Sequence, residues 1–210
     1  MHKSIVFLCA NGDSLIRFRG ELLKKFLSKG FSVHALVSDI NPIYMTQLTE
    51  LGVEVKMISL RRKSLNPVHA VTDLINISSA VNLIKPSMIF SYTHKSVILG
   101  AFVGLWNKIP FRYSLITGTG HIFERETFRK KLLSITACFV FKISLFISTK
   151  VIFQNKDDKK LFINLKLAPA KKCFVVNGSG VDLDHFSQET LPSDFSFICL
   201  TRLISSKGVW

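Results

Sequence analysis

Short apolar segments alternate with helical patterns along almost the whole chain, and this alternation constrains the fold more than any other feature. The alternation predicts an α/β fold with a doubly wound, mostly parallel sheet. Nearly continuous apolar character is typical of strands that are covered on both faces. Seven segments have this character: Ser4–Cys9, Phe31–Val37, Val53–Ile58, Met88–Tyr92, Arg112–Ile116, Val151–Phe153 and Cys173–Val176.

Helix signals lie between several of these strands. Gly30 ends a stripe of apolar residues at helical spacing, formed by Leu15, Phe18, Leu22, Leu23 and Phe26. Asn41-Pro42 and Asn66-Pro67 each place an N-cap residue before a proline in the first helical turn. Asn155 can cap a further helix that has Asp157 and Asp158 near its positive end.

The segment Leu132–Phe153 is the most membrane-like part of the sequence. Lys142 and Lys150 interrupt it, so we expect a buried core helix with one face at a membrane surface, not a spanning helix. Four cations precede it, and basic charge beside apolar residues suits an anionic bilayer. The alternative is an ordinary solvated helix start. These cations are Arg125, Arg129, Lys130 and Lys131.

A formal charge of +14 favours anionic partners, whether phosphates, nucleic acid or an acidic membrane face. No nucleic-acid recognition motif is present, so we expect no nucleic-acid partner. The four cysteines are scattered without metal-ligand spacing, which predicts no metal site and fits a reduced cytosolic compartment. The N-terminal apolar run is too short for a signal peptide.

A polar stretch, Gln188–Asp194, predicts a domain boundary. We expect one Rossmann-like domain over residues 1–190, and a linker with the first strand of a second, truncated domain over 191–210. The apolar run Phe195–Leu200 is the expected strand.

Ligands of open α/β sheets bind beyond the carboxyl ends of the strands, so the residues there are the candidate site. Asn11 and Gly12 follow the first strand without a GxGxxG motif, which argues against a nicotinamide or flavin cofactor. His94 and Lys95 follow the fourth strand and can bind a diphosphate or a sugar hydroxyl. For both pairs an ordinary polar loop is the competing interpretation.

Three later strand ends carry further candidates. Thr117, Gly118, Gly120 and His121 share one turn, where the glycines permit close backbone approach and the histidine can transfer a proton. Gly178 lies in a glycine-rich turn. Past the apolar run Phe195–Leu200, Arg202 and Lys207 suit a nucleotide diphosphate, although in isolation a solvated basic turn is the favoured interpretation.

Taken in order, five runs resemble the GT4-type glycosyltransferases of bacterial glycan assembly, most closely the branch that extends undecaprenyl-diphosphate-linked sugars. The resemblance covers essentially the whole chain. The runs are Leu60–Pro67, Thr117–Phe123, Val151–Asn155, Gly178–Asp182, and Arg202-Leu203 with Lys207-Gly208.

The resemblance implies the GT-B fold, in which two Rossmann-like domains face a cleft, with no metal or other cofactor. It implies transfer with retention of configuration from a nucleotide-sugar, expected to be UDP-linked, to a lipid-linked or polysaccharide acceptor. Arg202 and Lys207 then stabilise the leaving diphosphate, and His121 is a candidate catalytic residue. The cleft residues would be Asn11, Gly12, His94, Lys95, Thr117, Gly118, Gly120, Asn155 and Gly178.

The family's downstream acidic motif lies beyond Trp210, so we expect that the 210-residue chain alone does not transfer sugar. The expected location is the cytoplasmic side, peripheral on the inner face of the cell membrane. The alternative is a non-catalytic module that holds a lipid-linked glycan or a partner transferase.

Overall fold

The computed structural model describes residues 3–61, 67–118, 128–183, 186–201 and 208, with side chains for all of these except 67 and 128–135. The chain divides into two units, Met1–Gly180 and Val181–Trp210. All helices and strands of the described residues belong to the first unit.

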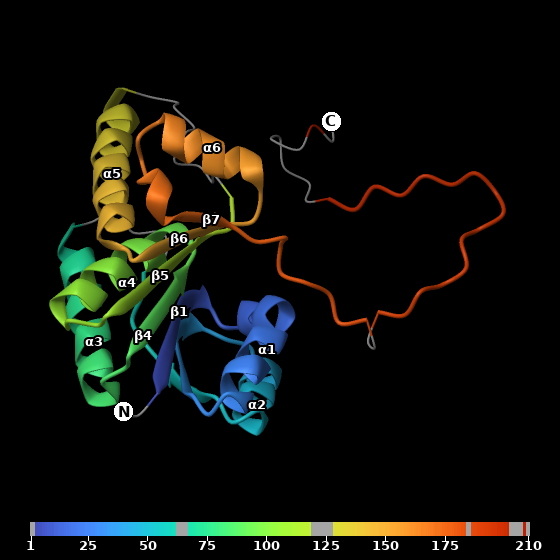
Figure 1. Ribbon diagram of the computed structural model, residues 1–210, viewed down its shortest axis with the longest axis horizontal. Helices are drawn as coiled ribbons and strands as arrows, with labels where there is room; N and C mark the ends of the chain where they lie inside the picture. Colours follow the sequence, from blue (N-terminus) through green and yellow to red (C-terminus); the bar gives the residue numbers. More distant parts are fainter. Residues whose placement is uncertain (1–2, 62–66, 119–127, 184–185, 202–207, 209–210) are drawn as a thin grey trace. The chain divides into compact units, whose positions relative to one another are not determined.

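The first unit is built on a parallel sheet with the strand order β3-β2-β1-β4-β5-β6-β7 (Figure 1). The predicted α/β fold with a doubly wound sheet is therefore confirmed. All seven predicted strands are present, with ends that shift by no more than two residues. The strands are β1 (Ser4–Asn11), β2 (Ser32–Asp39), β3 (Glu54–Met57), β4 (Met88–Tyr92), β5 (Phe111–Ile116), β6 (Lys150–Phe153) and β7 (Cys173–Val175).

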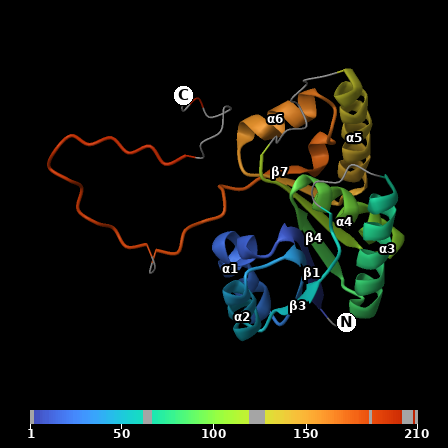
Figure 2. The same cartoon turned by 180° about the vertical axis from the view of Figure 1, so that it is seen from behind.

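Helices connect consecutive strands and cover the sheet on both sides. Helices α1 and α2 lie on one face, and α3, α4 and α5 lie on the other (Figures 1 and 2). The helices are α1 (Asp13–Ser28), α2 (Pro42–Glu50), α3 (Pro67–Ile84), α4 (His94–Trp106), α5 (Phe128–Ile147) and α6 (Lys156–Asn164), with a 3₁₀ turn at Ala170–Lys172.

The core of the sheet follows from side-chain alternation along β1. Phe7 and its neighbours on the same side pack towards α1 and α2, while Leu8 and its neighbours pack towards α3 and α4. A third apolar cluster joins α5 and α6, where the ring of Phe162 meets those of Phe141 and Phe153. Covering on both faces explains why the strands are apolar throughout.

Helix α1 differs from its predicted stripe. Phe18 and Leu22 are exposed, at 53% and 36%. The buried residues are instead Leu15, Arg19 and Leu23, which are spaced four apart and so face the sheet together. An arginine therefore takes a core position that the stripe assigned to apolar residues.

Helix ends behave largely as predicted. Asn41 accepts a hydrogen bond from the Ile43 amide at 3.0 Å, and Asn155 accepts one from the Asp158 amide at 2.6 Å, so both act as N-caps. The carboxyl end of α5 is capped by cations from other elements. Arg112 Nε donates to the Ile147 carbonyl at 3.0 Å, and the Lys172 ammonium donates to the carbonyls of Phe146 and Ser148.

Helix α4 was not among the predicted elements. Its sequence is apolar on nearly every side, so it shows no helical period, and seven of its residues are buried. Two glycines let it approach the sheet closely. A Cβ at Gly100 would lie 1.9 Å from Ser91 Oγ, and one at Gly104 would lie 2.8 Å from Arg112 Cδ.

The second unit, Val181–Trp210, forms no helix or strand among its described residues. The strand predicted over Phe195–Leu200 is not formed in this chain and stays a prediction. A strand needs a partner for its backbone groups, and no described segment pairs with this one. Its apolar side chains remain exposed, with Phe195, Phe197 and Leu200 at 96% or more.

None of the helices in the described part of the chain is both long and apolar enough to cross a membrane.

Candidate functional site at the carboxyl edge of the sheet

The strand order reverses between β1 and β4, because the chain leaves β1 towards β2 and returns from β3 to β4 on the other side. Ligands of open α/β sheets bind beyond the carboxyl ends of the strands at such a point. Asn11 ends β1 there, and Tyr92 and Thr93 lie at the end of β4. The predicted residues Asn11, Gly12, His94 and Lys95 are thus brought together around the switch point.

The turn after β1 is fixed by its own hydrogen bonds. Asn11 Oδ1 accepts from the Asp13 amide at 2.8 Å, and the Gly12 amide donates to the Asp39 carbonyl at 2.7 Å. A Cβ on Gly12 would lie 2.7 Å from Ile40 Cδ1. The approach of Ile40 therefore requires glycine at this position, and the predicted contact of Gly12 with a ligand stays a prediction.

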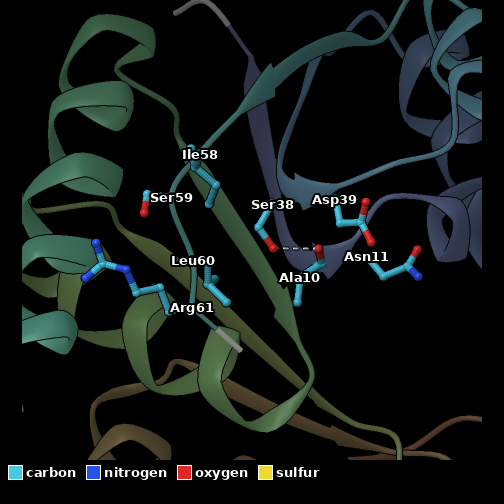
Figure 3. A pocket seen from close by; sticks show the side chains of 8 residues that line it. All are labelled: Ala10, Asn11, Ser38, Asp39, Ile58, Ser59, Leu60 and Arg61. Carbon is cyan, nitrogen blue, oxygen red and sulfur yellow. Dashed lines mark hydrogen bonds between the residues drawn. The ribbon is translucent and has the colours of Figure 1, made fainter. Parts of the chain in front are cut away.

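A cavity of about 400 Å³ opens beside this turn, at the carboxyl ends of β1, β2 and β3 (Figure 3). Its lining residues carry a carboxylate, an amide, two hydroxyls and a guanidinium, of which the Ser59 hydroxyl and the Arg61 guanidinium are directed away from Ser38 and Asp39 (Figure 3). Ser38 Oγ donates to the Ala10 carbonyl at 2.8 Å. Such a mixed set suits a ligand that carries hydroxyl groups. The lining residues are Ala10, Asn11, Ser38, Asp39, Ile58, Ser59, Leu60 and Arg61.

Lys95 has a structural role that the sequence did not indicate. Its ammonium lies 2.9 Å from Asp73 Oδ2, and it donates to the Arg61 carbonyl at 2.6 Å. Asp73 has no exposed side-chain surface, and its Oδ2 also accepts from the Arg61 amide at 3.3 Å. The pair therefore anchors the cavity wall at Arg61 to α3 and α4. The ammonium is committed to these contacts, which argues against the predicted diphosphate role for Lys95.

His94 lies in the first turn of α4 instead of in a loop, and its ring centre is 5.5 Å from that of Phe141. The preceding residue, Thr93, has φ 70°, in the left-handed region that a β-branched residue rarely adopts. Thr93 Oγ1 donates to Ser96 Oγ at 3.1 Å. Strain of this kind is concentrated at functional sites, and here it marks the end of β4 at the switch point.

A buried polar cluster lies beneath the switch point. The Tyr92 hydroxyl is 2.8 Å from Ser14 Oγ, which donates to the Asn11 carbonyl at 2.6 Å. The Arg19 guanidinium lies over the Tyr92 ring, 5.3 Å from its centre, and binds the Phe18 carbonyl and Ser179 Oγ. Arg19 was not predicted as a site residue. In the sequence, an arginine on an otherwise apolar helix is expected to point into solvent.

Burial shifts the titration of this cluster. It raises the pKa of the Cys9 thiol to about 12, and hydrogen bonds from Tyr92 and Ser14 and the charge of Arg19 oppose the shift only in part. Burial also raises the pKa of Tyr92 well above its usual value and lowers that of Arg19. At neutral pH Cys9 is a thiol, not a nucleophilic thiolate.

The Cys9 shift predicts a loss of stability in alkali. The unfolded thiol ionises near pH 9.0 and the native thiol near 12, so between these values the unfolded chain binds fewer protons and the free energy of unfolding falls as pH rises. We expect Cys9→Ala to flatten this fall in urea unfolding between pH 8 and pH 11. The same substitution at exposed Cys199 should leave the slope unchanged. A wild-type slope in the Cys9→Ala variant would contradict the prediction.

The remaining predicted residues lie on other strand ends. Thr117 and Gly118 follow β5, and Gly118 has φ 149° with open space around it. The Asn155 side chain makes both of its hydrogen bonds to Asp158, which argues for a capping role instead of a cleft role. Gly178 has φ 68° in the turn whose Ser179 Oγ contacts Arg19 and accepts from Gln154 Nε2 at 3.0 Å.

Four predicted residues lie outside the described residues: Gly120, His121, Arg202 and Lys207. Their roles stay predictions. Within the described part of the chain, no three His, Cys, Asp or Glu side chains come close enough to hold a metal ion.

No protein-family model matches the sequence. A curated relative does match: the N,N'-diacetylbacillosaminyl-diphospho-undecaprenol alpha-1,3-N-acetylgalactosaminyltransferase of Campylobacter jejuni subsp. jejuni serotype O:2 is 28% identical over 182 residues, which cover 87% of this chain and 48% of the relative. A solved glycosyltransferase from Rickettsia africae superposes with a TM-score of 0.61 and 15% identity, over 88% of this chain and 45% of its own.

The chain has the fold of the N-terminal half of a GT-B glycosyltransferase. It spans about half the length of these two proteins. The GT-B fold alone does not determine a reaction: a UDP-N-acetylglucosamine 2-epimerase superposes with a TM-score of 0.53 and 13% identity, over 83% of this chain and 48% of its own.

Proposed function

We propose that this chain is the acceptor-side half of a retaining glycosyltransferase that transfers a sugar from a nucleotide-sugar to a lipid-linked glycan. The observation that carries the proposal is the 28% identity, over 87% of the chain, to a Campylobacter protein named for transfer of N-acetylgalactosamine to a diphospho-undecaprenol-linked sugar. The solved structures support the fold alone, since transferases and epimerases share it.

The cavity at the ends of β1, β2 and β3 is the proposed site for a sugar of the acceptor. Asp39 and Ser38 offer a carboxylate and a hydroxyl, and Arg61 offers a guanidinium. A carboxylate accepts hydrogen bonds from sugar hydroxyls but repels a diphosphate. The acceptor's sugar therefore suits Asp39, and its diphosphate suits Arg61.

The donor side of the proposal rests on residues outside the described part of the chain. Arg202 and Lys207 would stabilise negative charge on the diphosphate of a UDP-linked donor as the glycosidic bond breaks. His121 is the proposed catalytic residue. The proposed location is the cytoplasmic side, on the inner face of the membrane where a lipid-linked acceptor is held.

A transfer assay tests the function. The complete protein that contains this chain is incubated with radiolabelled UDP-sugars and a short-chain polyprenyl-diphosphate-linked sugar. We expect label to move to the lipid, and Asp39→Ala to raise KM for the acceptor about tenfold with a smaller change in kcat. Glu50→Ala, on the exposed side of α2, is the control and should behave as wild type.

Two outcomes would contradict the proposal. Epimerisation of the UDP-sugar without transfer would indicate that the chain belongs to an epimerase with the same fold. Acceptor binding by the complete protein without any transfer would favour a non-catalytic module that holds the lipid-linked glycan.

A further inference from the structure

Helix α3 is apolar on two opposite sides. Its inner side packs Ile77, Ala80 and Val81 into the core beneath the sheet. Its outer side exposes Val68, Val71, Ile75 and Leu83 at 65%, 54%, 59% and 78%. The first three are spaced three and four apart and so form one stripe. A helix that is apolar on both sides usually meets something other than water on the second.

Charge around this stripe is mostly positive. The exposed acid beside it is Glu54 of β3, which lines a hollow with Leu83 and Lys85 and lies 3.1 Å from His34 Nδ1. Asp73 is the only acidic residue within α3, α4 and α5, and it is buried against Lys95. The other exposed residues of α3 are Thr72, Asn76, Ser79 and Asn82, which carry no charge. Arg61 before the helix and Lys85 after it are both exposed cations. The outer side of α3 is thus a surface of apolar and uncharged polar side chains with an exposed cation beyond each end of the helix.

Trp106 lies at the same end of the helical layer as Leu83. It is the last residue of α4 and is 84% exposed. The next residue, Asn107, donates to Ser78 Oγ of α3 at 2.9 Å, which holds the end of α4 against α3 (Figure 2). The exposed cation Lys108 follows. An exposed tryptophan beside lysine is typical of a protein surface at the boundary between lipid and water.

We propose that the α3 face, defined as Val68, Val71, Ile75, Leu83 and Trp106, binds the surface of an anionic bilayer. Apolar side chains on a helix without exposed acids of its own, with cations at its ends, complement lipid chains beneath negative headgroups. This assigns membrane contact to α3 and the end of α4, whereas the sequence placed it at Leu132–Phe153. Membrane binding by this face rests on the proposed function, because an enzyme that acts on a lipid-linked acceptor must reach the membrane surface.

The test uses the fluorescence of Trp106 and needs no sugar donor. Vesicle binding and sugar transfer are therefore measured separately, and either proposal can be contradicted while the other is supported. The chain has two tryptophans, and Trp210→Phe leaves Trp106 as the sole probe. With vesicles of equal phosphatidylglycerol and phosphatidylethanolamine, we expect a blue shift and quenching by brominated lipid, both weakened by salt. Ile75→Glu in this background should weaken vesicle binding about tenfold.

Ile43→Glu is the matched control. Ile43 is 66% exposed on α2, on the opposite side of the sheet. Its replacement by glutamate adds the same charge at a similarly exposed position, but away from the α3 face. It should bind vesicles as the parent does. Equal loss in both variants, or no shift with anionic vesicles, would overturn the proposal. A shift that depends on protein concentration without vesicles would instead assign the face to a second copy. If a longer protein that contains this chain did not bind vesicles, the α3 face would instead be covered by another segment of that protein.

Discussion

Replacing Lys95 by methionine is expected to lower the free energy of unfolding by about 3–5 kcal/mol, because it leaves a buried carboxylate without its cation. Asp73 has no exposed side-chain surface, and within the described part of the chain its Oδ2 would keep only the long contact from the Arg61 amide at 3.3 Å. Among the described residues its Oδ1 has no hydrogen-bond partner. Urea unfolding followed by circular dichroism measures the loss.

A second ion pair provides the control for Lys95→Met. Lys24 and Glu21 lie 2.6 Å apart, but their side chains are 52% and 66% exposed. Lys24→Met should therefore change stability by less than about 0.5 kcal/mol. The double variant Lys95→Met/Asp73→Leu removes both charges and should recover most of the loss. If it were as unstable as Lys95→Met alone, the buried charge would not be the cause.

Replacing Gly100 by alanine is expected to destabilise the chain by about 1–3 kcal/mol, through overpacking between α4 and the sheet. The new Cβ would lie 1.9 Å from Ser91 Oγ, 3.0 Å from Ser91 Cβ and 3.2 Å from Leu8 Cδ2. The Ser91 hydroxyl can rotate and the Leu8 methyl can shift, but Ser91 Cβ is fixed to the strand backbone, so this contact pushes α4 away from the sheet. Chemical unfolding at neutral pH measures the effect.

Gly20 offers the opposite case within another helix. A Cβ there has no heavy atom within 4 Å. Gly20→Ala should stabilise the chain by about 0.5–1 kcal/mol, because alanine loses less backbone entropy in a helix. Equal effects at Gly20 and Gly100 would mean that helix propensity, and not the close approach of α4, determines the outcome.

The sheet could be predicted because each buried strand carries its own local signal. Every predicted strand of the first unit is present, as are the caps at Asn41 and Asn155. Helix α4 carried no such signal, because a helix that is apolar on nearly every side has no polar face to reveal its period. The strand predicted over Phe195–Leu200 stays a prediction, because apolar character indicates a potential strand but hydrogen bonding to a neighbouring strand is needed to form one.

The site was less predictable than the fold because it depends on which strand ends become neighbours. The cavity joins the ends of β1, β2 and β3, and Arg61 and Ser59 carried no motif that linked them to Asp39. Lys95 was recognised as a cation at a strand end, but its partner Asp73 comes from a different helix. Arg19 was missed because its burial follows from contacts with Tyr92 and Ser179 at distant positions.

Hydrogen exchange of the 210-residue chain, with and without a short-chain polyprenyl-diphosphate-linked sugar, tests whether this half of the molecule binds the acceptor. We expect slower amide exchange at residues 10–11, 38–39 and 58–61, which line the cavity at the carboxyl edge of the sheet. The Asp39→Ala variant should lose this protection. Protection elsewhere, or the same protection from a UDP-sugar alone, would contradict an acceptor site in this half of the molecule.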